Sequence, residues 1–184
     1  EKSMKRNNLE LIDYAIYFAT KAHNGQKRKS DDNVDMIFHP FTVGMILQRN
    51  GANDECVISG ILHDIIEDTK YTYEDVSKEF GEKIANIVEE VSEKKELEWK
   101  ARKQEAIDRI KVASIEGKLV ECADKISNLE TMYEIYKEQG EDLWKSFKKP
   151  KEEQKWYYTE MYNAVIMNTD EKNKLFERYK RILD

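Results

Sequence analysis

Residues 60–69, with the sequence GILHDIIEDT, place four ligand-type side chains within an otherwise apolar run. These side chains are His63, Asp64, Glu67 and Asp68. In a continuous helix, residues four apart share a face, so His63 would lie over Glu67 and Asp64 over Asp68. Burying ionisable groups beside aliphatic residues costs free energy unless they are paired or bind a cation. For this stretch alone, a metal site and a solvated charged helix face are about equally good interpretations.

Two residues elsewhere can complete a metal-ligand set. His39 stands directly before Pro40, and Asp124 interrupts an apolar helical stripe. With His63 and Asp64 they offer two imidazole nitrogens and two carboxylate oxygens, which suit Mn²⁺, Fe²⁺, Co²⁺ or Zn²⁺ better than Ca²⁺. A metal of this kind activates water and polarises a phosphoryl oxygen. The set therefore predicts hydrolysis of a phosphate ester or anhydride.

Further residues have roles that fit this chemistry. Glu67 and Asp68 lie one turn beyond His63 and Asp64, where they could hold or deprotonate the attacking water as a general base. Arg28 and Lys29 could grip a phosphorylated ligand from a loop. His23 is expected to form hydrogen bonds at a helix end rather than to bind a metal.

Each of these residues also has an ordinary structural interpretation. Glu67 and Asp68 could be solvated acids at a helix end, and His39 could bond to the backbone at a helix terminus. Asp124 could be a buried acid paired with Lys125 or with an arginine, and the basic pair at 28–29 could be plain surface. For each residue considered alone, the structural role is the better interpretation. The occurrence of all of them in one chain favours a metal and catalytic site.

Helical periodicity predicts the elements that must hold these residues. Apolar residues recur every three or four positions from residue 9 to 22, and the polar segment 26–35 that follows is expected to be a loop. Pro40 suits the first position of the next helix. A helix capped by Asp54 is expected to run through the opening motif to about Asp68, and Thr72 with Asp75 predicts the cap of another that ends at Gly81.

The second half of the chain shows the same periodicity. A helix is predicted at 84–91, a highly charged connection or exposed helix start at 92–103, and a helix that ends near residues 116–117. The stripe from Leu119 toward Lys137 predicts a helix on which Asp124 and Asn128 share a face. Pro150 separates two closing helices.

Composition agrees with a helical protein. The chain has 184 residues, 40% hydrophobic and 37% charged, with seven glycines and two prolines, so an all-α single domain over residues 1–184 is expected. The net charge of -6 argues against a nucleic-acid-binding surface. Cys56 and Cys122 form no CxxC motif, which favours a reducing cytoplasm, and the apolar runs fall short of a membrane span.

With these residues in view, the sequence resembles the HD superfamily of metal-dependent phosphohydrolases. The motifs that carry the likeness are AHNGQKRK at 22–29, FHP at 38–40, LHD with EDT at 62–69, FG at 80–81 and ADKISNL at 123–129. Together they are similar to the hydrolase domain of Rel/Spo stringent-response proteins, and above all to stand-alone small alarmone hydrolases. The similarity extends over roughly residues 9–165.

The resemblance implies an HD-type helical bundle with a metal site between central helices. It implies Mn²⁺-dependent removal of the 3′-pyrophosphate of guanosine tetra- and pentaphosphate, with a small nucleotide as the partner and a homo-oligomer left open. The implied metal ligands are His39, His63, Asp64 and Asp124, and Glu67 with Asp68 would position the water. Arg28 and Lys29 match the pair that contacts the nucleotide, and Asn128 matches an asparagine at the substrate.

One segment departs from the family pattern. Where the family usually has Gly-x-Pro-Tyr, this chain has NVDM at 33–36. The change removes an aromatic ring near the expected pocket, and Asp35 adds a negative charge. A relative that acts on another nucleotide, or on a phosphorylated dinucleotide, is therefore the first alternative, and a non-catalytic nucleotide or metal sensor is the second. A helical scaffold with surface acids is a third.

Overall fold

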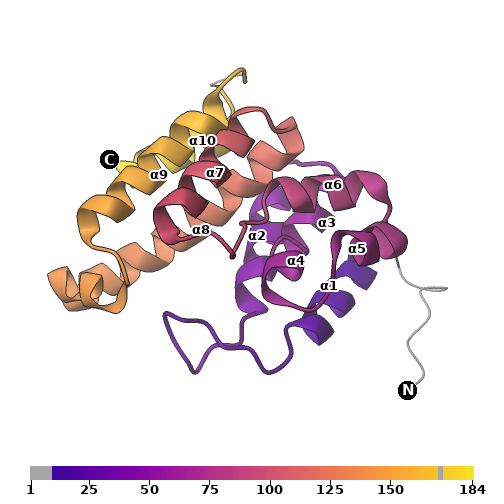
Figure 1. The fold of residues 1–184 in the computed structure, drawn as a ribbon, viewed down its shortest axis with the longest axis horizontal. Coiled ribbons are helices and arrows are strands. Elements are labelled where there is room, and N and C mark those ends of the chain that lie inside the picture. The colour runs from indigo at the N-terminus through magenta and orange to yellow at the C-terminus, as the bar shows by residue number, and fades with distance from the viewer. Residues whose placement is uncertain (1–9, 170–171) are drawn as a thin grey trace. The chain divides into compact units, whose positions relative to one another are not determined.

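The structure, a computed structural model, describes residues 10–169 and 172–184 and is built from helices (Figure 1). Within these residues the β-structure is an isolated antiparallel bridge between Lys27 and Asp35. The all-α prediction is confirmed, while Leu9, where the first helix was expected to begin, lies outside the described residues. The elements are α1 (Leu11–Ala22), α2 (Phe38–Arg49), α3 (Asp54–Ile61), α4 (Ile65–Asp68), α5 (Tyr73–Phe80), α6 (Glu82–Glu90), α7 (Trp99–Lys111), α8 (Ile115–Gln139), the 3-10 helix η2 (Gly140–Ser146), α9 (Lys151–Ile166) and α10 (Lys174–Leu183).

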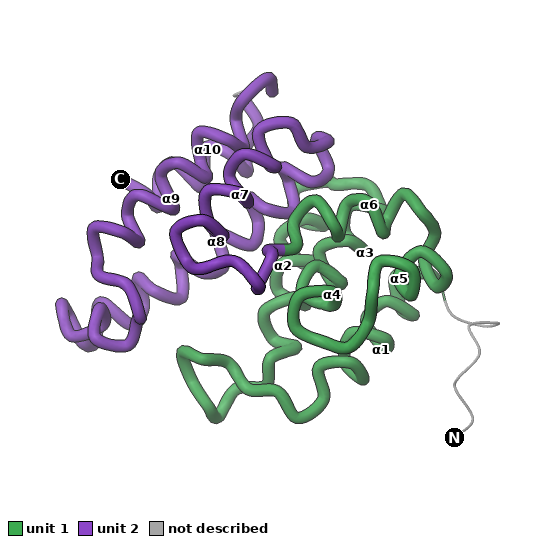
Figure 2. Tube along the Cα trace, in the orientation of Figure 1, with its two compact units in different colours: residues 1–92 green, residues 93–184 purple. Residues whose placement is uncertain are grey.

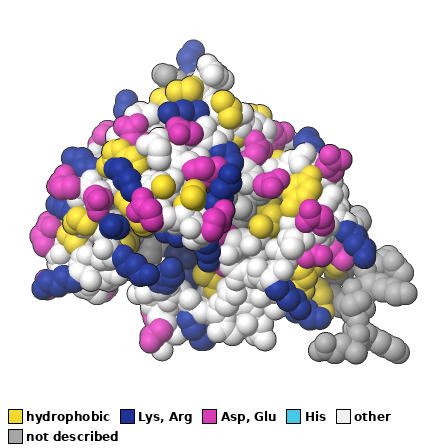
Figure 3. Space-filling view, in the orientation of Figure 1, with side chains coloured by type: hydrophobic (Ala, Val, Ile, Leu, Met, Phe, Trp, Pro, Cys, Tyr) yellow, Lys and Arg dark blue, Asp and Glu magenta, His cyan; other side chains and the backbone are white. Residues whose placement is uncertain are grey.

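The chain divides into two compact units, which are described separately (Figure 2). Unit 1 is Glu1–Ser92 and unit 2 is Glu93–Asp184. The single domain expected over residues 1–184 stays a prediction. Basic and acidic side chains are interspersed on the face drawn in Figure 3, as expected for a chain with so many charges of both signs. No helix in the described residues is long and apolar enough to cross a membrane.

In unit 1, α2 packs closely against α3 because two glycines lie at the contact. A Cβ on Gly44 would lie 2.5 Å from Ile61 Cγ1, and a Cβ on Gly60 would lie 2.5 Å from Leu47 Cδ1. Real side chains do not approach so closely, so only glycine allows this distance between the helix backbones. The contact fixes the start of α2 relative to the end of α3.

The opening motif is not one continuous helix, and that expectation was wrong. Helix α3 ends at Ile61 and α4 begins at Ile65. In an unbroken helix the Gly60 carbonyl would accept from the amide of Asp64. Instead it accepts from the amide of His63 at 3.4 Å and from the His63 ring nitrogen Nδ1 at 2.7 Å. The His63 ring therefore takes the Gly60 carbonyl as its acceptor in place of the backbone amide that would continue the helix, and α3 ends there.

The helix ends in unit 1 match the sequence pattern in part. The Thr72–Asp75 capping box and the C-cap Gly81 are confirmed. Asn53, and not Asp54, caps α3, because its side chain accepts from the amide of Cys56. Pro40 occupies the third position of α2 rather than the first. It is tolerated there because amides of the first turn have no partner within the helix.

In unit 2, the long α8 packs against α9, α10 and η2, and α7 packs against α9. The predicted helix end at residues 116–117 was wrong. Helix α7 ends at Lys111, and Ser114 caps α8 by accepting from the amide of Gly117. Pro150 directly precedes α9, and α10 follows, so the two closing helices are confirmed.

We expect Gly60→Ala to destabilise the protein by about 1–3 kcal/mol, because its Cβ would overlap the fully buried Leu47 and force α2 and α3 apart. Denaturant unfolding monitored by circular dichroism measures this change. Lys78→Ala, on the exposed face of α5, is the control and should change stability by less than about 0.5 kcal/mol. Equal stability of the Gly60 variant and the wild type would contradict the close contact.

Candidate metal and active site

His39 and His63 lie side by side within unit 1. His39 is in the first turn of α2, and His63 is in the turn between α3 and α4. Their ring centroids are 5.1 Å apart in an edge-on arrangement, and each residue is only 3% exposed. Two of the predicted metal ligands are therefore brought together from segments that are separate in the sequence.

The hydrogen bond of His63 determines which of its nitrogens can bind a metal. Nδ1 faces the carbonyl of Gly60 at 2.7 Å and must donate, because a carbonyl only accepts. In the neutral ring, Nε2 then carries the lone pair, and it lies 3.2 Å from Oδ2 of Asp64. A lone pair and a carboxylate oxygen repel each other unless a proton or a metal ion lies between them. A backbone acceptor on one nitrogen and a carboxylate beside the other is the arrangement that metal-binding histidines use.

Three carboxylates gather at α4. Asp64 directly precedes this helix, and its carbonyl accepts from the amide of Asp68 at 2.9 Å. One carboxylate oxygen from each of Asp64, Glu67 and Asp68 lies within 4.8 Å of the others. Asp64 is buried, whereas Glu67 and Asp68 are half-buried. Three negative charges so close together favour a cation or a hydrogen-bonded water, and of the four predicted metal ligands only Asp64 belongs to this carboxylate group.

The basic loop that precedes α2 is a short bridged turn. The amide of Arg28 donates to Val34 O at 2.9 Å, and Lys27 forms an ion pair with Asp35. Arg28 is half-buried and its guanidinium approaches Met36 Sδ at 4.0 Å, whereas Lys29 is exposed. Lys27 therefore offsets the negative charge that Asp35 adds to this loop.

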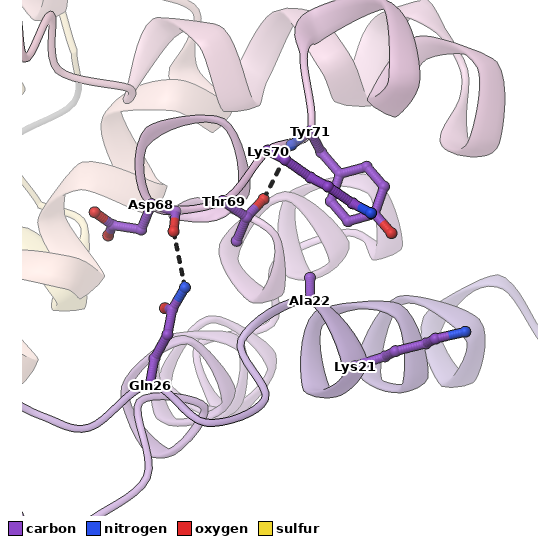
Figure 4. A pocket seen from close by; sticks show the side chains of 7 residues that line it. All are labelled: Lys21, Ala22, Gln26, Asp68, Thr69, Lys70 and Tyr71. Carbon is purple, nitrogen blue, oxygen red and sulfur yellow. Dashed lines mark hydrogen bonds between the residues drawn. The ribbon is translucent and has the colours of Figure 1, made fainter.

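His23 forms the hydrogen bonds at a helix end that the sequence predicted. It follows α1, and its amide donates to Ala19 O. Its ring nitrogen Nδ1 lies 2.9 Å from Oε1 of Gln26, whose side-chain amide donates to the carbonyl of Asp68 at 2.8 Å. Gln26 and Asp68 also line a cavity of about 530 Å³ with Lys21, Ala22, Thr69, Lys70 and Tyr71 (Figure 4).

Asp124 lies on α8 in unit 2, one turn before Asn128. The two side chains share a face as expected, with Asn128 Nδ2 3.3 Å from Oδ1 of Asp124. Oδ2 of Asp124 lies 2.7 Å from Nζ of Lys125, so the pairing that the sequence offered as an alternative is also present. This pairing places a positive charge beside one oxygen of the carboxylate, and Asn128 contacts the other.

Lys125 sits within a buried group of charges that the sequence reasoning missed. Its ammonium contacts Glu121 Oε1 at 3.2 Å, and both side chains are only 6% exposed. Burial alone would lower the pKa of Lys125, but the carboxylates of Asp124 and Glu121 outweigh it and raise that pKa well above its ordinary value. Burial also raises the pKa of Glu121, and the nearby Asp124 carboxylate raises it further, while Lys125 acts in the opposite direction.

The neighbouring helices extend this group. Lys103 on α7 binds both carboxylate oxygens of Glu93 at 2.9 Å and lies over the ring of Tyr157, from α9. Burial lowers the pKa of Lys103. The spacing of four between Glu121 and Lys125 was a visible signal for part of this group. The contacts with Glu93 and Tyr157 depend on helix packing, which the sequence pattern does not specify.

The profile of the HD domain family matches residues 15–149, well over half of the chain. The chain belongs to the HD domain family. HD phosphohydrolases depend on a metal ion, and the histidines and carboxylates of unit 1 fit that requirement. The resemblance drawn from the motifs is thus confirmed at the level of the family.

Relatives of this HD domain protein include named hydrolases. A guanosine-3′,5′-bis(diphosphate) 3′-pyrophosphohydrolase of Aquifex aeolicus is 30% identical over 193 residues, which cover 94% of this chain but only 27% of that protein. A second protein with the same enzyme name, MESH1 of Xenopus tropicalis, is 39% identical over 121 residues. The match covers 65% of this chain and 68% of MESH1. The chain therefore spans only about a quarter of the Aquifex protein.

Two solved structures share the fold. The crystal structure of lmo0812 from Listeria monocytogenes EGD-e is 33% identical, with a TM-score of 0.75 over 79% of this chain and 96% of that one. A metazoan ortholog of SpoT, described as hydrolysing ppGpp, has a TM-score of 0.78 over 98% of this chain and 96% of that one. At 23% identity, the second likeness supports the fold alone. Together they confirm the HD-type helical architecture.

Lys125→Met should destabilise the protein by about 3–5 kcal/mol, because it leaves the buried carboxylate of Glu121 and the half-buried one of Asp124 beside each other without their shared cation. Urea unfolding at neutral pH measures the loss. Adding Glu121→Leu to Lys125→Met removes one of the uncompensated charges and should recover part of that stability. A loss below about 1 kcal/mol in the single variant would show that Lys125 does not hold this group together.

The buried tyrosines predict a loss of stability at high pH. Burial raises the pKa of Tyr158 to about 12, and it raises the pKa of Tyr157 and Tyr179 well above the ordinary value. The folded state therefore keeps its phenol protons. The stability that they contribute is complete below about pH 10 and is lost as the pH rises toward 12.

Near-ultraviolet absorbance of phenolate, recorded alongside circular dichroism, measures this behaviour. A late phase of tyrosine ionisation should coincide with unfolding, and Tyr158→Phe should make that phase smaller. If all ten tyrosines ionised near pH 10 in the folded protein, these side chains would not be buried as described.

Proposed function

We propose that this chain is a metal-dependent hydrolase that removes the 3′-pyrophosphate of guanosine tetra- and pentaphosphate and forms GDP or GTP and pyrophosphate. The observation that carries the proposal is the arrangement in unit 1, where Nε2 of His63 faces the carboxylate of Asp64 and two further acids lie beside it. The names of the Aquifex and Xenopus relatives support the substrate. The proposal places a single domain at residues 1–184, in the cytoplasm, without a nucleic-acid or membrane partner.

The proposed metal ligands are His39, His63, Asp64 and Asp124, and the proposed metal is Mn²⁺. Two imidazole nitrogens and two carboxylate oxygens form a mixed donor set that suits this ion. When bound, the metal supplies a positive charge that activates water and draws electron density from the phosphoryl group. The bonds of His63 to Gly60 and of Asn128 to Asp124 would hold two of these ligands in orientation.

Glu67 and Asp68 are the proposed groups that position and deprotonate the attacking water. Both are half-buried, so their oxygens reach solvent while the helix backbone fixes them. Attack by water on the phosphorus attached to the ribose 3′ oxygen breaks that ester bond and releases pyrophosphate. The water gives its proton to a carboxylate, and the 3′ oxygen leaves as a hydroxyl after it takes up a proton.

Arg28, Lys29 and Asn128 are proposed to contact the substrate. A guanidinium and an ammonium from one loop suit the phosphates of a highly anionic nucleotide. Arg28 is half-buried and approaches Met36, so its position is more restricted than that of the exposed Lys29. Arg28 should therefore contribute more to substrate affinity, since less side-chain freedom is lost when the ligand binds.

Purified protein supplied with Mn²⁺ should release pyrophosphate from guanosine tetraphosphate. Glu67→Gln should lower kcat by about 10²–10⁴-fold, the usual contribution of a general base. Asp124→Asn should lose bound metal and pyrophosphate release together, because an amide is a weaker ligand than a carboxylate. Pyrophosphate release is measured by a coupled assay, and bound metal by elemental analysis.

Glu74→Gln, an exposed acid in the first turn of α5, is the matched control and should retain wild-type activity. A panel with GDP, GTP and a phosphorylated dinucleotide tests the substrate. Preference for the dinucleotide would move the assignment to another nucleotide. No hydrolysis of any member with Mn²⁺ present would overturn the proposal, as would full activity of the Asp124 variant.

A further inference from the structure

Gln26 forms hydrogen bonds through both polar atoms of its side-chain amide and through both its backbone amide and its backbone carbonyl. Its amide donates to His23 O at 3.0 Å, and its carbonyl accepts from the amide of Met36 at 2.8 Å. Oε1 faces Nδ1 of His23 at 2.9 Å, and Nε2 donates to the carbonyl of Asp68 at 2.8 Å. This one residue therefore joins the end of α1, the approach to α2 and the end of α4.

The bond to Asp68 matters because α4 is only four residues long. The last four carbonyls of any helix lack partners within it, and a single helical turn is marginal by itself. Gln26 supplies a partner for one of these carbonyls from 42 positions earlier in the chain. Figure 4 shows its side chain reaching across to the backbone of Asp68, while the Asp68 carboxylate points away from the lined cavity.

The hydrogen-bond roles fix the orientation of the Gln26 amide. Its NH₂ group must face the Asp68 carbonyl, because two carbonyl oxygens would repel each other. Its Oε1 therefore faces His23 and accepts from Nδ1–H of that ring. His23 is only 1% exposed, so this donor cannot move away to solvent. His23 thus holds Gln26 in the orientation that serves Asp68.

The same connections reach a proposed metal ligand. Met36 donates its amide to Gln26 O, and its own carbonyl accepts from the amide of His39 at 3.1 Å. A continuous path of hydrogen bonds therefore runs from His39 through Met36 and Gln26 to the end of α4. The bonds at the two ends of this path serve groups at the start of α2 and the end of α4, and the bond between Met36 and Gln26 closes the loop that joins them.

We propose that Gln26, oriented by His23, is a positioning residue that sets Glu67 and Asp68 relative to His39. The inference rests on the proposed hydrolytic function for its effect on catalysis, but its structural part can be measured separately. Gln26 touches neither the reacting phosphate nor the water in this scheme. It acts by holding the short helix that carries the acids.

Gln26→Glu is the sharpest test, because it keeps the size and shape of the side chain but places an acceptor against the Asp68 carbonyl. We expect kcat to fall by about 10–100-fold, the effect of a small misplacement of catalytic groups. KM should change by less than about threefold, since substrate contacts are kept. Amide hydrogen exchange across residues 65–71 should become about five- to tenfold faster, equivalent to one lost hydrogen bond.

Three further variants separate positioning from general damage. His23→Asn keeps an N–H donor close to the position of Nδ1 and should retain most of kcat, whereas His23→Leu should behave like Gln26→Glu. Lys21→Met lines the same cavity but is exposed, so it should change neither kcat nor the exchange rate. Thermal unfolding of every variant shows whether an effect is local to residues 65–71.

The outcomes distinguish this inference from the proposed function. If the wild type hydrolyses no nucleotide, the proposed function fails, while faster exchange at residues 65–71 in Gln26→Glu still supports the positioning role. Wild-type exchange in Gln26→Glu overturns the inference whether or not the protein is active. In an active protein, a kcat within twofold of wild type for Gln26→Glu also overturns it, as does equal loss in His23→Asn and His23→Leu.

Discussion

The close approach of α2 and α3 is the constraint on which the histidine pair depends. Gly44 and Gly60 leave no room for a Cβ between these helices, so the two backbones meet directly. His39 lies five residues before one glycine and His63 three residues after the other, and the contact holds their rings 5.1 Å apart. A Cβ at either glycine would overlap the side chain of Ile61 or Leu47, so that this side chain or the helix would have to shift. Gly44 and Gly60 therefore contribute to the position of His39 and His63, although they have no side chain that could bind a ligand.

Gly60 has a second effect, through its carbonyl. By accepting from Nδ1 of His63, it ends α3 and fixes the histidine tautomer with a single bond. The turn that follows sets Asp64 beside Nε2, and α4 then carries Glu67 and Asp68 for one short turn. So short a helix needs support from outside, and Gln26 supplies it. The interruption of the helix thus changes the direction of the backbone between His63 and α4 and places the Asp64 carboxylate beside both Nε2 of His63 and the acids of α4.

Periodicity in the sequence predicted most helices, the Thr72–Asp75 cap and the shared face of Asp124 and Asn128, because these features depend on neighbours within one or two turns. Periodicity failed at residues 62–64, where the His63 ring binds the Gly60 carbonyl and ends the helix. A continuous helix and an interrupted one have the same apolar pattern there. Periodicity also missed the bond from Gln26 to Asp68 and the buried contacts of Lys103. Those contacts join segments that only folding brings together, so no local spacing encodes them.

Lys125 places a cation beside the carboxylate that is proposed to bind another cation. The ammonium of Lys125, 2.7 Å from Asp124, offsets the negative charge of that acid, and the same positive charge would oppose a divalent ion on this carboxylate. Glu121, 3.2 Å from the same ammonium, offsets part of the positive charge of Lys125 and so weakens its repulsion of a metal ion. If Asp124 bound a metal ion as proposed, Lys125 would keep Glu121 as an acidic partner one turn away, and without the metal it lies between Glu121 and the half-buried Asp124. The ammonium of Lys125 would then have a carboxylate partner in either case, and because an unpaired buried charge costs several kcal/mol, this arrangement would suit a ligand carboxylate in unit 2.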